Sequence, residues 1–240
     1  MIIEVCANSY DSALNAEKAG ADRIELCTEL AVGGITPSYG TILKVKEDLK
    51  LAVNVLIRPR SGNFSFSEAE FDIMKRNISF CKEIGCEGVV SGILSKDLTI
   101  DLNRTQELAN LAKPMSFTFH RAFDWVGNPL NELEKLIEIK IDRILTSGQQ
   151  SSAVKGLNLL KQLQEKAGQK LIILPGGGIN SSNILEFKRA GFKEVHFSGI
   201  KLHKTHYKLK VSMNNDKLFN ENQIVISNFK KIKEIVELVK

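Results

Sequence analysis

Short β-branched segments alternate with longer amphipathic segments along most of the chain. The short segments predict strands at Ile2–Ala7, Asp22–Cys27, Ala52–Ile57, Glu87–Gly92, Pro114–His120, Asp142–Ser147, Lys170–Pro175 and Glu194–Ser198. The amphipathic segments predict helices at Ser9–Ala19, Ser38–Asp48, Ser67–Ile84, Asp101–Ala112, Leu130–Ile139, Ser152–Ala167, Ser181–Ala190 and Asn228–Val239. Alternating strands and helices form right-handed parallel units, and eight units close into a barrel rather than an open sheet. The sequence therefore predicts an α/β fold, a parallel eight-stranded (β/α)8 TIM barrel.

The chain has 240 residues, close to the length of about 250 residues that is typical of one such barrel. We therefore expect a single TIM-barrel domain over residues 1–240. Residues 201–226 do not fit the alternation, because they are rich in Lys and Asn and show no turn from an eighth strand into a helix. We expect them to form an irregular basic loop before the last helix, and connections of that length usually have a function.

The net charge of +5 is confined to the C-terminal part of the chain. Residues 201–240 hold nine Lys against four Asp and Glu, whereas residues 1–200 hold 24 basic and 24 acidic side chains. Binding to nucleic acid would require clustered Arg and stacking aromatic side chains on a basic face. The charge distribution therefore predicts no nucleic-acid partner.

Nothing in the sequence indicates export or a membrane. The first residues form no basic leader followed by an apolar run, and no stretch has the length of a membrane span. Four cysteines in a chain of this length do not form a disulfide framework, which favours a reducing compartment. We therefore expect a cytoplasmic protein with no membrane partner.

Alternation along each strand predicts which side chains point into the barrel. In the first strand Ile3 and Val5 would face the helices, which turns Glu4 and Cys6 inward. The same alternation turns a further set inward: Glu25, Cys27, Asn54, Leu56, Arg58, Thr118, His120, His196 and Ser198. A barrel interior normally holds Val, Ile and Leu, and buried ionisable groups are costly unless they are paired. This interior is therefore unusual.

The inward charged residues predict a functional pocket at the C-terminal ends of the strands, where barrels carry their active sites. The candidates for acid–base or electrostatic roles are Glu4, Glu25, Arg58, His120 and His196. The alternative is structural, because Glu4, Glu25 and Arg58 could form a satisfied internal ion-pair network. For His120 the corresponding alternative is a hydrogen-bonded core histidine.

Glycines follow the seventh strand, and a further Ser-Gly pair follows the eighth. The candidate anion-binding residues are Gly176, Gly177, Gly178, Ser198 and Gly199. Glycines let backbone N–H groups approach an anion, and the loops after these two strands are the usual phosphate site of barrels. The alternative is a tight strand-to-helix turn that needs positive φ angles.

Cys6 and Cys27 should lie side by side near the mouth of the barrel, on adjacent parallel strands. Two thiolates on neighbouring strands can hold a soft ion such as Cu(I). The alternative is a pair of small buried residues that act as hydrophobes. A zinc site is disfavoured because the chain has no closely spaced Cys-x-x-Cys pair.

Several of these segments also form a recognisable series. The motifs, in order, are Glu4-Val5-Cys6, Arg23-Ile24-Glu25-Leu26-Cys27, Gly33-Gly34-Ile35-Thr36-Pro37-Ser38, Ile57-Arg58-Pro59-Arg60-Ser61-Gly62, Phe117-Thr118-Phe119-His120-Arg121-Ala122-Phe123-Asp124, Leu145-Thr146-Ser147-Gly148 and Pro175-Gly176-Gly177-Gly178-Ile179. As a set, the series resembles the CutC family of copper-homeostasis proteins. The resemblance implies a barrel fold, a cytoplasmic location and Cu(I) binding at Cys6 and Cys27. It extends to Gly199 and weakens in the Lys-rich segment that follows.

Three functions are open at this point, the third being a scaffold engaged through the basic residues 201–226. The first is a Cu(I)-binding protein of copper homeostasis that uses Cys6 and Cys27. The second is an enzyme acting on a small anionic, for example phosphorylated, metabolite, with the glycine loops holding the anion. Glu4, Glu25 and His120 would then supply acid–base chemistry. The partner is a copper ion or a small anion, and the sequence leaves open whether the chain forms a homodimer.

Overall fold

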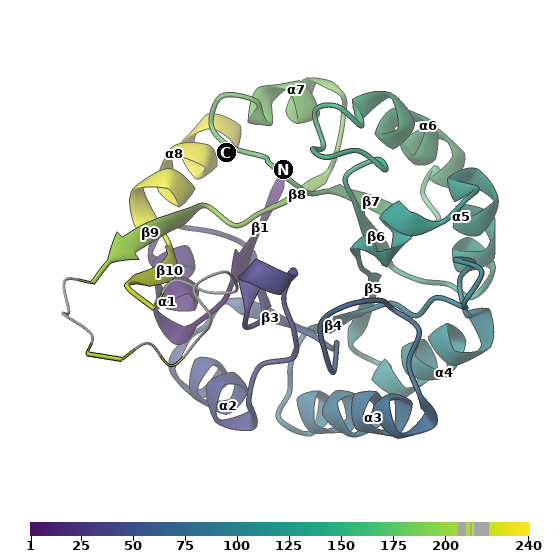
Figure 1. Cartoon of the computed structure of the whole chain (residues 1–240). Coiled ribbons are helices and arrows are strands. Elements are labelled where there is room, and N and C mark those ends of the chain that lie inside the picture. Colours follow the sequence, from purple (N-terminus) through teal and green to yellow (C-terminus); the bar gives the residue numbers. More distant parts are fainter. Residues whose placement is uncertain (206–209, 212, 214–220) are drawn as a thin grey trace.

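The structure is a computed structural model and describes residues 1–205, 210–211, 213 and 221–240. Its central strands are β1 (Ile2–Ala7), β2 (Arg23–Leu26), β3 (Ala52–Leu56), β4 (Gly88–Ser91), β5 (Ser116–Phe119), β6 (Arg143–Thr146), β7 (Ile172–Pro175) and β8 (Glu194–Phe197). Its α-helices are α1 (Tyr10–Lys18), α2 (Tyr39–Asp48), α3 (Glu68–Glu83), α4 (Leu102–Ala112), α5 (Pro129–Glu138), α6 (Leu157–Ala167), α7 (Ile184–Arg189) and α8 (Phe229–Val239). The strands form an inner ring and the helices surround it (Figure 1).

The inner ring is a closed parallel barrel. Neighbouring strands pair in the order β7-β6-β5-β4-β3-β2-β1-β8. The remaining side, between β7 and β8, is closed by a parallel bridge between Gly176 and His196. A Cβ at position 176 would lie 2.5 Å from Cδ1 of Leu145, so any larger residue there would have to displace that side chain. The predicted eight-stranded barrel is confirmed.

Capping side chains set where several helices begin. Ser67 accepts a hydrogen bond from the backbone N–H of Glu70, whose carboxylate accepts one from the Ser67 N–H, which completes a capping box at α3. Helix α6 begins at Leu157 rather than at the predicted Ser152. Helix α7 begins at Ile184 rather than at the predicted Ser181. The turn before α6 instead hydrogen-bonds to the loop after β7. These two loops therefore meet at the mouth of the barrel.

Apolar side chains fill two separate regions, as alternation along the strands predicts. The larger region lies between the strands and the helices and includes Ile3. The smaller cluster consists of Cys6, Cys27, Leu56 and Val90, on four neighbouring strands. Much of the remaining interior is polar, which distinguishes this barrel from one filled with Val, Ile and Leu.

The prediction of an irregular loop over 201–226 is wrong at both ends of that segment. Strands β9 (Ile200–Lys204) and β10 (Gln223–Ser227) form an antiparallel ladder in which Leu202 lies opposite Val225. The β-branched run from Ile224 to Ile226 explains this pairing. Residues 206–209, 212 and 214–220 of the predicted loop lie outside the described residues.

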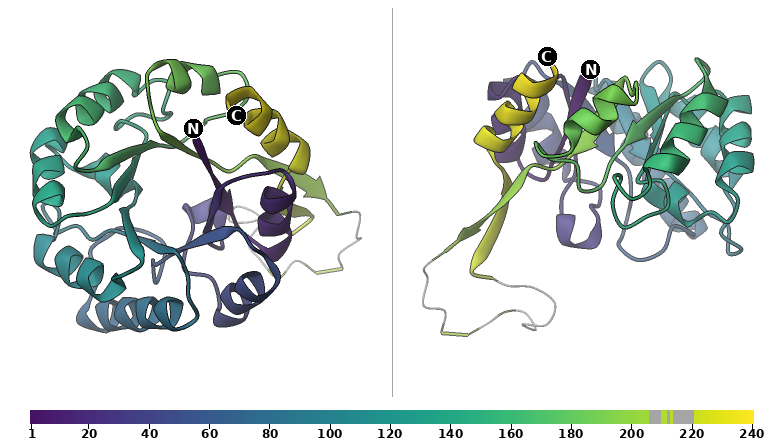
Figure 2. Two further views of the ribbon diagram at one scale, coloured as in Figure 1. Left: turned by 180° about the vertical axis from the view of Figure 1, so that it is seen from behind. Right: turned by 90° about the horizontal axis from the view of Figure 1, so that it is seen from above.

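The hairpin extends from the end of the barrel opposite to the two chain ends (Figure 2, right). Strand β10 contacts α1 and β1, which joins the hairpin to the first βα unit. Within the described part of the chain, no helix combines the length and apolar character that a bilayer span requires. The organisation as a single domain over residues 1–240 stays a prediction.

Candidate functional site

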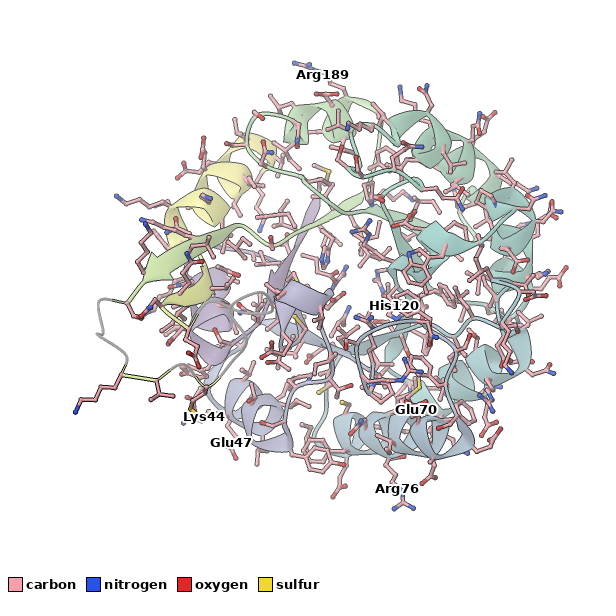
Figure 3. All side chains as sticks on the ribbon, in the orientation of Figure 1. Lys44, Glu47, Glu70, Arg76, His120 and Arg189 are labelled. Carbon is pink, nitrogen blue, oxygen red and sulfur yellow. The ribbon has the colours of Figure 1, made fainter. Side chains whose placement is uncertain are left out.

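A cavity of about 720 Å³ opens at the C-terminal ends of the strands. Its ionisable and thiol lining comes from Cys6, Glu25, Arg58, His120, Arg121, Asp124 and His196. Leu30, Val32, Leu56, Phe64, Trp125, Leu145, Ile179 and Phe197 supply apolar and aromatic lining. His120 lies inside the ring of strands, whereas Lys44, Arg76 and Arg189 extend outward from the helices (Figure 3). The predicted pocket therefore lies where the strand ends bring polar side chains together.

Glu4 lies beneath this cavity and is completely buried. Its Oε2 accepts hydrogen bonds from Nε of Arg23 at 2.5 Å and from Nδ2 of Asn54 at 3.3 Å. Its Oε1 lies 2.8 Å from Nδ1 of His196. Burial alone would raise the pKa of Glu4, but Arg23 and His196 lower it to about 2. Glu4 is therefore an ionised anchor with both oxygen atoms engaged.

The ion pairing continues below Glu4. Glu194 accepts hydrogen bonds from Nη2 of Arg23 at 2.6 Å and from Nε of Arg143 at 2.9 Å. The sequence interpretation missed Arg23 and Glu194 as members of the site. The signal was present, because they precede the inward residues Glu25 and His196 by two positions and so share their face of the strand. An ion-pair network exists, but of the three residues in the structural alternative only Glu4 belongs to it, and neither Glu25 nor Arg58 does.

Glu25 lies beside this network but is not part of it. The side chain is 5 % exposed, and its Oε2 has no hydrogen-bond partner among the described residues. Burial raises the pKa of Glu25 to about 7, with Glu4 adding to the rise and His196 opposing it. Donor atoms of Cys6, Glu25 and His196 lie within 4.8 Å of one another. The structure thus brings together three residues that the sequence placed on three strands.

His196 connects this group to the anchor. Burial would lower the pKa of His196, but a hydrogen bond to Cys6 and the nearby carboxylates of Glu25 and Glu4 raise it well above its usual value. Because Nδ1 faces Glu4, Nε2 is the ring nitrogen left for the pocket side. His196 therefore faces a carboxylate on one side and the Cys6–Glu25 pair on the other.

Cys6 and Cys27 lie together as predicted. Their Sγ atoms are 3.6 Å apart, and all four cysteines of the chain are free. The hydrogen bond to Cys27 and burial raise the pKa of the Cys6 thiol well above its usual value. Cys6 borders the cavity, whereas Cys27 is 1 % exposed and packs with Leu56 and Val90. The sulfur pair fits a soft monovalent ion by its chemistry.

His120 follows β5, and its ring packs where Gly92, the residue after β4, has no side chain. A Cβ at Gly92 would lie 2.6 Å from Nδ1 of His120. The same Nδ1 accepts a hydrogen bond from the backbone N–H of Ala122 at 3.2 Å, which leaves the ring proton on Nε2. That Nε2 is buried and has no partner among the described residues. Burial, with Arg58 nearby, lowers the pKa of His120 to about 3, so the ring is neutral.

Arg58 borders the cavity but donates mainly to loop carbonyl groups. Nη1 donates to the carbonyl groups of Val32 and Gly34 at 2.8 and 2.9 Å, and Nη2 donates to that of Gly62 at 2.8 Å. The guanidinium also lies 4.9 Å from the ring centre of Phe64. Arg58 therefore joins the loops after β2 and β3, and its predicted catalytic role stays a prediction.

The comparisons with known proteins agree with this architecture. The model of the CutC family matches residues 1–201. The chain belongs to the CutC family. A CutC family protein of Parabacteroides distasonis is 44% identical over 241 residues, which cover 100% of this chain and 98% of the relative. A human relative named copper homeostasis protein cutC homolog is 44% identical over 198 residues, 82% of this chain and 72% of the relative.

Solved structures place this CutC chain among barrels. A CutC protein from Streptococcus agalactiae is 31% identical, with a TM-score of 0.78, and the match covers 82% of this chain and 98% of that one. Thiamine phosphate pyrophosphorylase from Pyrococcus furiosus is 14% identical, with a TM-score of 0.60 over 99% of this chain and 95% of that one. The second likeness shows the shared fold alone.

Only some of the residues predicted to bind an anion, in the loops after β7 and β8, border the cavity. Gly177, Gly178 and Ser198 border the cavity, but Gly176 and Gly199 do not. Gly176 closes the barrel, and Gly199 faces α8, where a Cβ would lie 3.2 Å from Ile232. Within the described residues, the backbone N–H groups of Gly178 and Ser198 donate to no protein acceptor.

Arg121 completes this side of the pocket. Its Nε donates to Asp124 at 2.8 Å and its Nη2 donates to Oγ of Ser147 at 2.8 Å. Its Nη1 lies 3.6 Å from the position that a Cβ would take at Gly177. The Arg121 guanidinium, paired with Asp124, and the backbone donors of Gly178 and Ser198 therefore line the same cavity as the Cys6–Glu25–His196 group.

Proposed function

We propose that this CutC protein binds Cu(I) in copper homeostasis and that Cys6 and Cys27 are the ligands. The observation that carries the proposal is the 3.6 Å separation of the two Sγ atoms on adjacent strands. Thiolate ligands select Cu(I), and two sulfur atoms from one wall can hold it. The name of the human relative supports the same class of function.

The position of the pair supports a route for the ion. Cys6 borders the cavity, and Cys27 lies behind it. An ion would therefore meet Cys6 first and then Cys27. The cytoplasm is the compartment we propose, because a reducing environment keeps the thiols free and keeps copper as Cu(I).

Anaerobic titration with a chromophoric Cu(I) chelator as competitor tests this proposal. The wild-type protein should bind one Cu(I), and both Cys6→Ser and Cys27→Ser should weaken binding by at least about 100-fold, since each removes one of two ligands. Cys81→Ser is the matched control, because Cys81 lies in α3, outside the pocket lining. Wild-type affinity in Cys27→Ser would contradict a two-sulfur site.

A second function, an acid–base enzyme acting on a small anion, is supported by unpartnered polar atoms in the same cavity. Oε2 of Glu25 and Nε2 of His120 are both buried without a partner among the described residues. A carboxyl group with a pKa near 7 is suited to proton transfer at neutral pH. The N–H groups of Gly178 and Ser198 beside Arg121 would hold the anion.

Thermal shift measurements with inorganic phosphate and with small sugar phosphates test the second function. A ligand of the folded state raises Tm in proportion to its occupancy. We expect the rise in wild-type protein and its loss in Arg121→Gln, with the exposed Arg76→Gln as the control. The enzyme proposal fails if no phosphate compound raises Tm of the wild-type protein.

The other partner expectations also stand as proposals. We propose no nucleic-acid partner and no membrane partner, on the charge distribution and the absence of a long apolar stretch in the sequence. A homodimer stays open, and light scattering of the purified chain measures it directly.

A further inference from the structure

Cys6, Glu25 and His196 meet on one wall of the cavity, and neither function above uses them together as ligands. Their donor atoms lie within 4.8 Å of one another, and all three side chains are buried. Thiolate, imidazole and carboxylate are the ligand types that Zn²⁺ takes in proteins, at about 2.0–2.3 Å. Donors of one tetrahedral ion are about 3.3–3.8 Å apart, so the three donor atoms, which lie within 4.8 Å of one another, would need to move together by up to about 1 Å.

The imidazole is already oriented as a metal ligand would be. Nδ1 of His196 lies 2.8 Å from Oε1 of Glu4, which leaves Nε2 for an ion. Metal-binding histidines usually donate their second ring nitrogen to a carboxylate in this way. Glu4 is fixed in turn by Arg23 and Asn54. The supporting shell of such a site is therefore present.

The charges on this wall also favour a divalent ion. Arg23 and Arg143 offset the carboxylates of Glu4 and Glu194, to which they are paired. Glu25 stands outside these pairs, and its buried Oε2 lacks a partner among the described residues. Once a bound ion displaces the protons of its ligands, a carboxylate at Glu25 and a thiolate at Cys6 would carry two negative charges, which one divalent cation balances.

We propose that Cys6, Glu25 and His196 bind a divalent transition ion, Zn²⁺ foremost, and that a further coordination position faces the cavity. The sulfur donor disfavours Mg²⁺ and Ca²⁺, which take oxygen ligands. A three-residue site with an open position is the arrangement of catalytic rather than structural zinc. The Arg121 guanidinium lines the same cavity, so an anionic ligand could reach both. The site shares Cys6 with the copper proposal but does not use Cys27.

Titration of the reduced, metal-free full-length protein with Co²⁺ tests the proposal, because cobalt reports its ligands spectroscopically. We expect a thiolate-to-cobalt absorption band that Zn²⁺ abolishes by displacement. Glu25→Gln and His196→Gln should each weaken Co²⁺ binding by at least about tenfold. Changing a residue that merely supports a metal ligand already costs about that much affinity. Cys6→Ser should remove the thiolate band. Cys27→Ser and His203→Gln, which replaces an exposed histidine on β9, should keep it.

Two results would overturn the divalent site. One is unchanged Co²⁺ affinity in both Glu25→Gln and His196→Gln, with the variants folded by circular dichroism. The other is loss of the band in Cys27→Ser but not in Glu25→Gln, which would assign the ion to the two thiols. Cu(I) titration of the same variants separates the proposals, since Cys27→Ser should impair copper alone and Glu25→Gln should impair the divalent ion alone.

Discussion

Glu4 and Glu25 lie in the same barrel on adjacent strands, but their surroundings differ. Glu4 is held by Arg23, Asn54 and His196, and its pKa is lowered to about 2. Glu25 borders the cavity with one oxygen atom unpartnered among the described residues, and its pKa is raised to about 7. Glu4 thus anchors an ion-pair network beneath the cavity, whereas Glu25 presents an unpartnered carboxyl oxygen beside the cavity. Both carboxylates are buried, so pairing rather than burial separates their properties.

The largest effect should follow from removing the anchor. Glu4→Gln removes one of the two carboxylates paired with the buried Arg23, and the one that faces His196, and should lower the free energy of unfolding by about 3–5 kcal/mol, the cost of breaking a buried ion pair on one side. Urea denaturation at pH 7 measures this change. Glu25→Gln is the matched control, and we expect it to change the same free energy by less than about 1 kcal/mol, because it leaves no new charge unpaired.

An equal loss in the two glutamine variants would remove the distinction between base and mouth. Refolding with intact far-UV circular dichroism would show that Glu4→Gln still reaches the native fold, so that its lower stability is a measured quantity rather than a failure to fold.

The next effect concerns His120 at the mouth, which is buried but neutral. Its pKa in the folded state, about 3, lies below the usual 6.5, so the unfolded state binds more protons between these values. The free energy of unfolding should therefore fall as the pH falls, with His120 contributing roughly 3 kcal/mol of loss between pH 7 and pH 4. Arg58 is the charged group facing the ring. His120→Asn should flatten this slope.

His203→Asn serves as the control for the acid experiment, because His203 is an exposed residue of β9. Its denaturation profile between pH 7 and pH 4 should match that of the wild-type protein. A wild-type slope in His120→Asn would mean that other groups, rather than the buried ring, produce the acid sensitivity.

Strand periodicity was sufficient to predict the barrel and the inward direction of Glu4, Glu25 and His196, because a period of two fixes the face of each side chain. It did not reveal which inward residues pair. That depends on the relative register of strands far apart in sequence, such as Glu4 opposite His196. Arg23 was overlooked for this reason, although its face was predictable.

The loops were harder to predict for a different physical reason. Arg58 was expected at the reaction centre, but its position relative to three carbonyl groups depends on loop conformations that periodicity does not describe. Gly176 and Gly199 have the composition of an anion site, yet barrel closure and the contact with α8 account for them. The β9–β10 hairpin was missed because its two strands are separated by 18 residues.

Arg58 provides the smallest and most local prediction. It sharpens the comparison because it is a charged residue at the mouth whose two Nη atoms, though not its buried Nε, donate to loop carbonyl groups. Arg58→Lys keeps the charge but loses the planar group that reaches carbonyl groups in two loops. We expect a loss of about 1–2 kcal/mol in the free energy of unfolding, typical of one or two hydrogen bonds.

Hydrogen exchange should accelerate in segments 29–36 and 59–66 while β1 and β2 stay protected. The exposed Arg76→Lys is the control. If exchange in both loops of Arg58→Lys stayed at the wild-type rate, the Arg58 hydrogen bonds would not be what stabilises these loops. Its guanidinium would then again be a candidate for binding an anion.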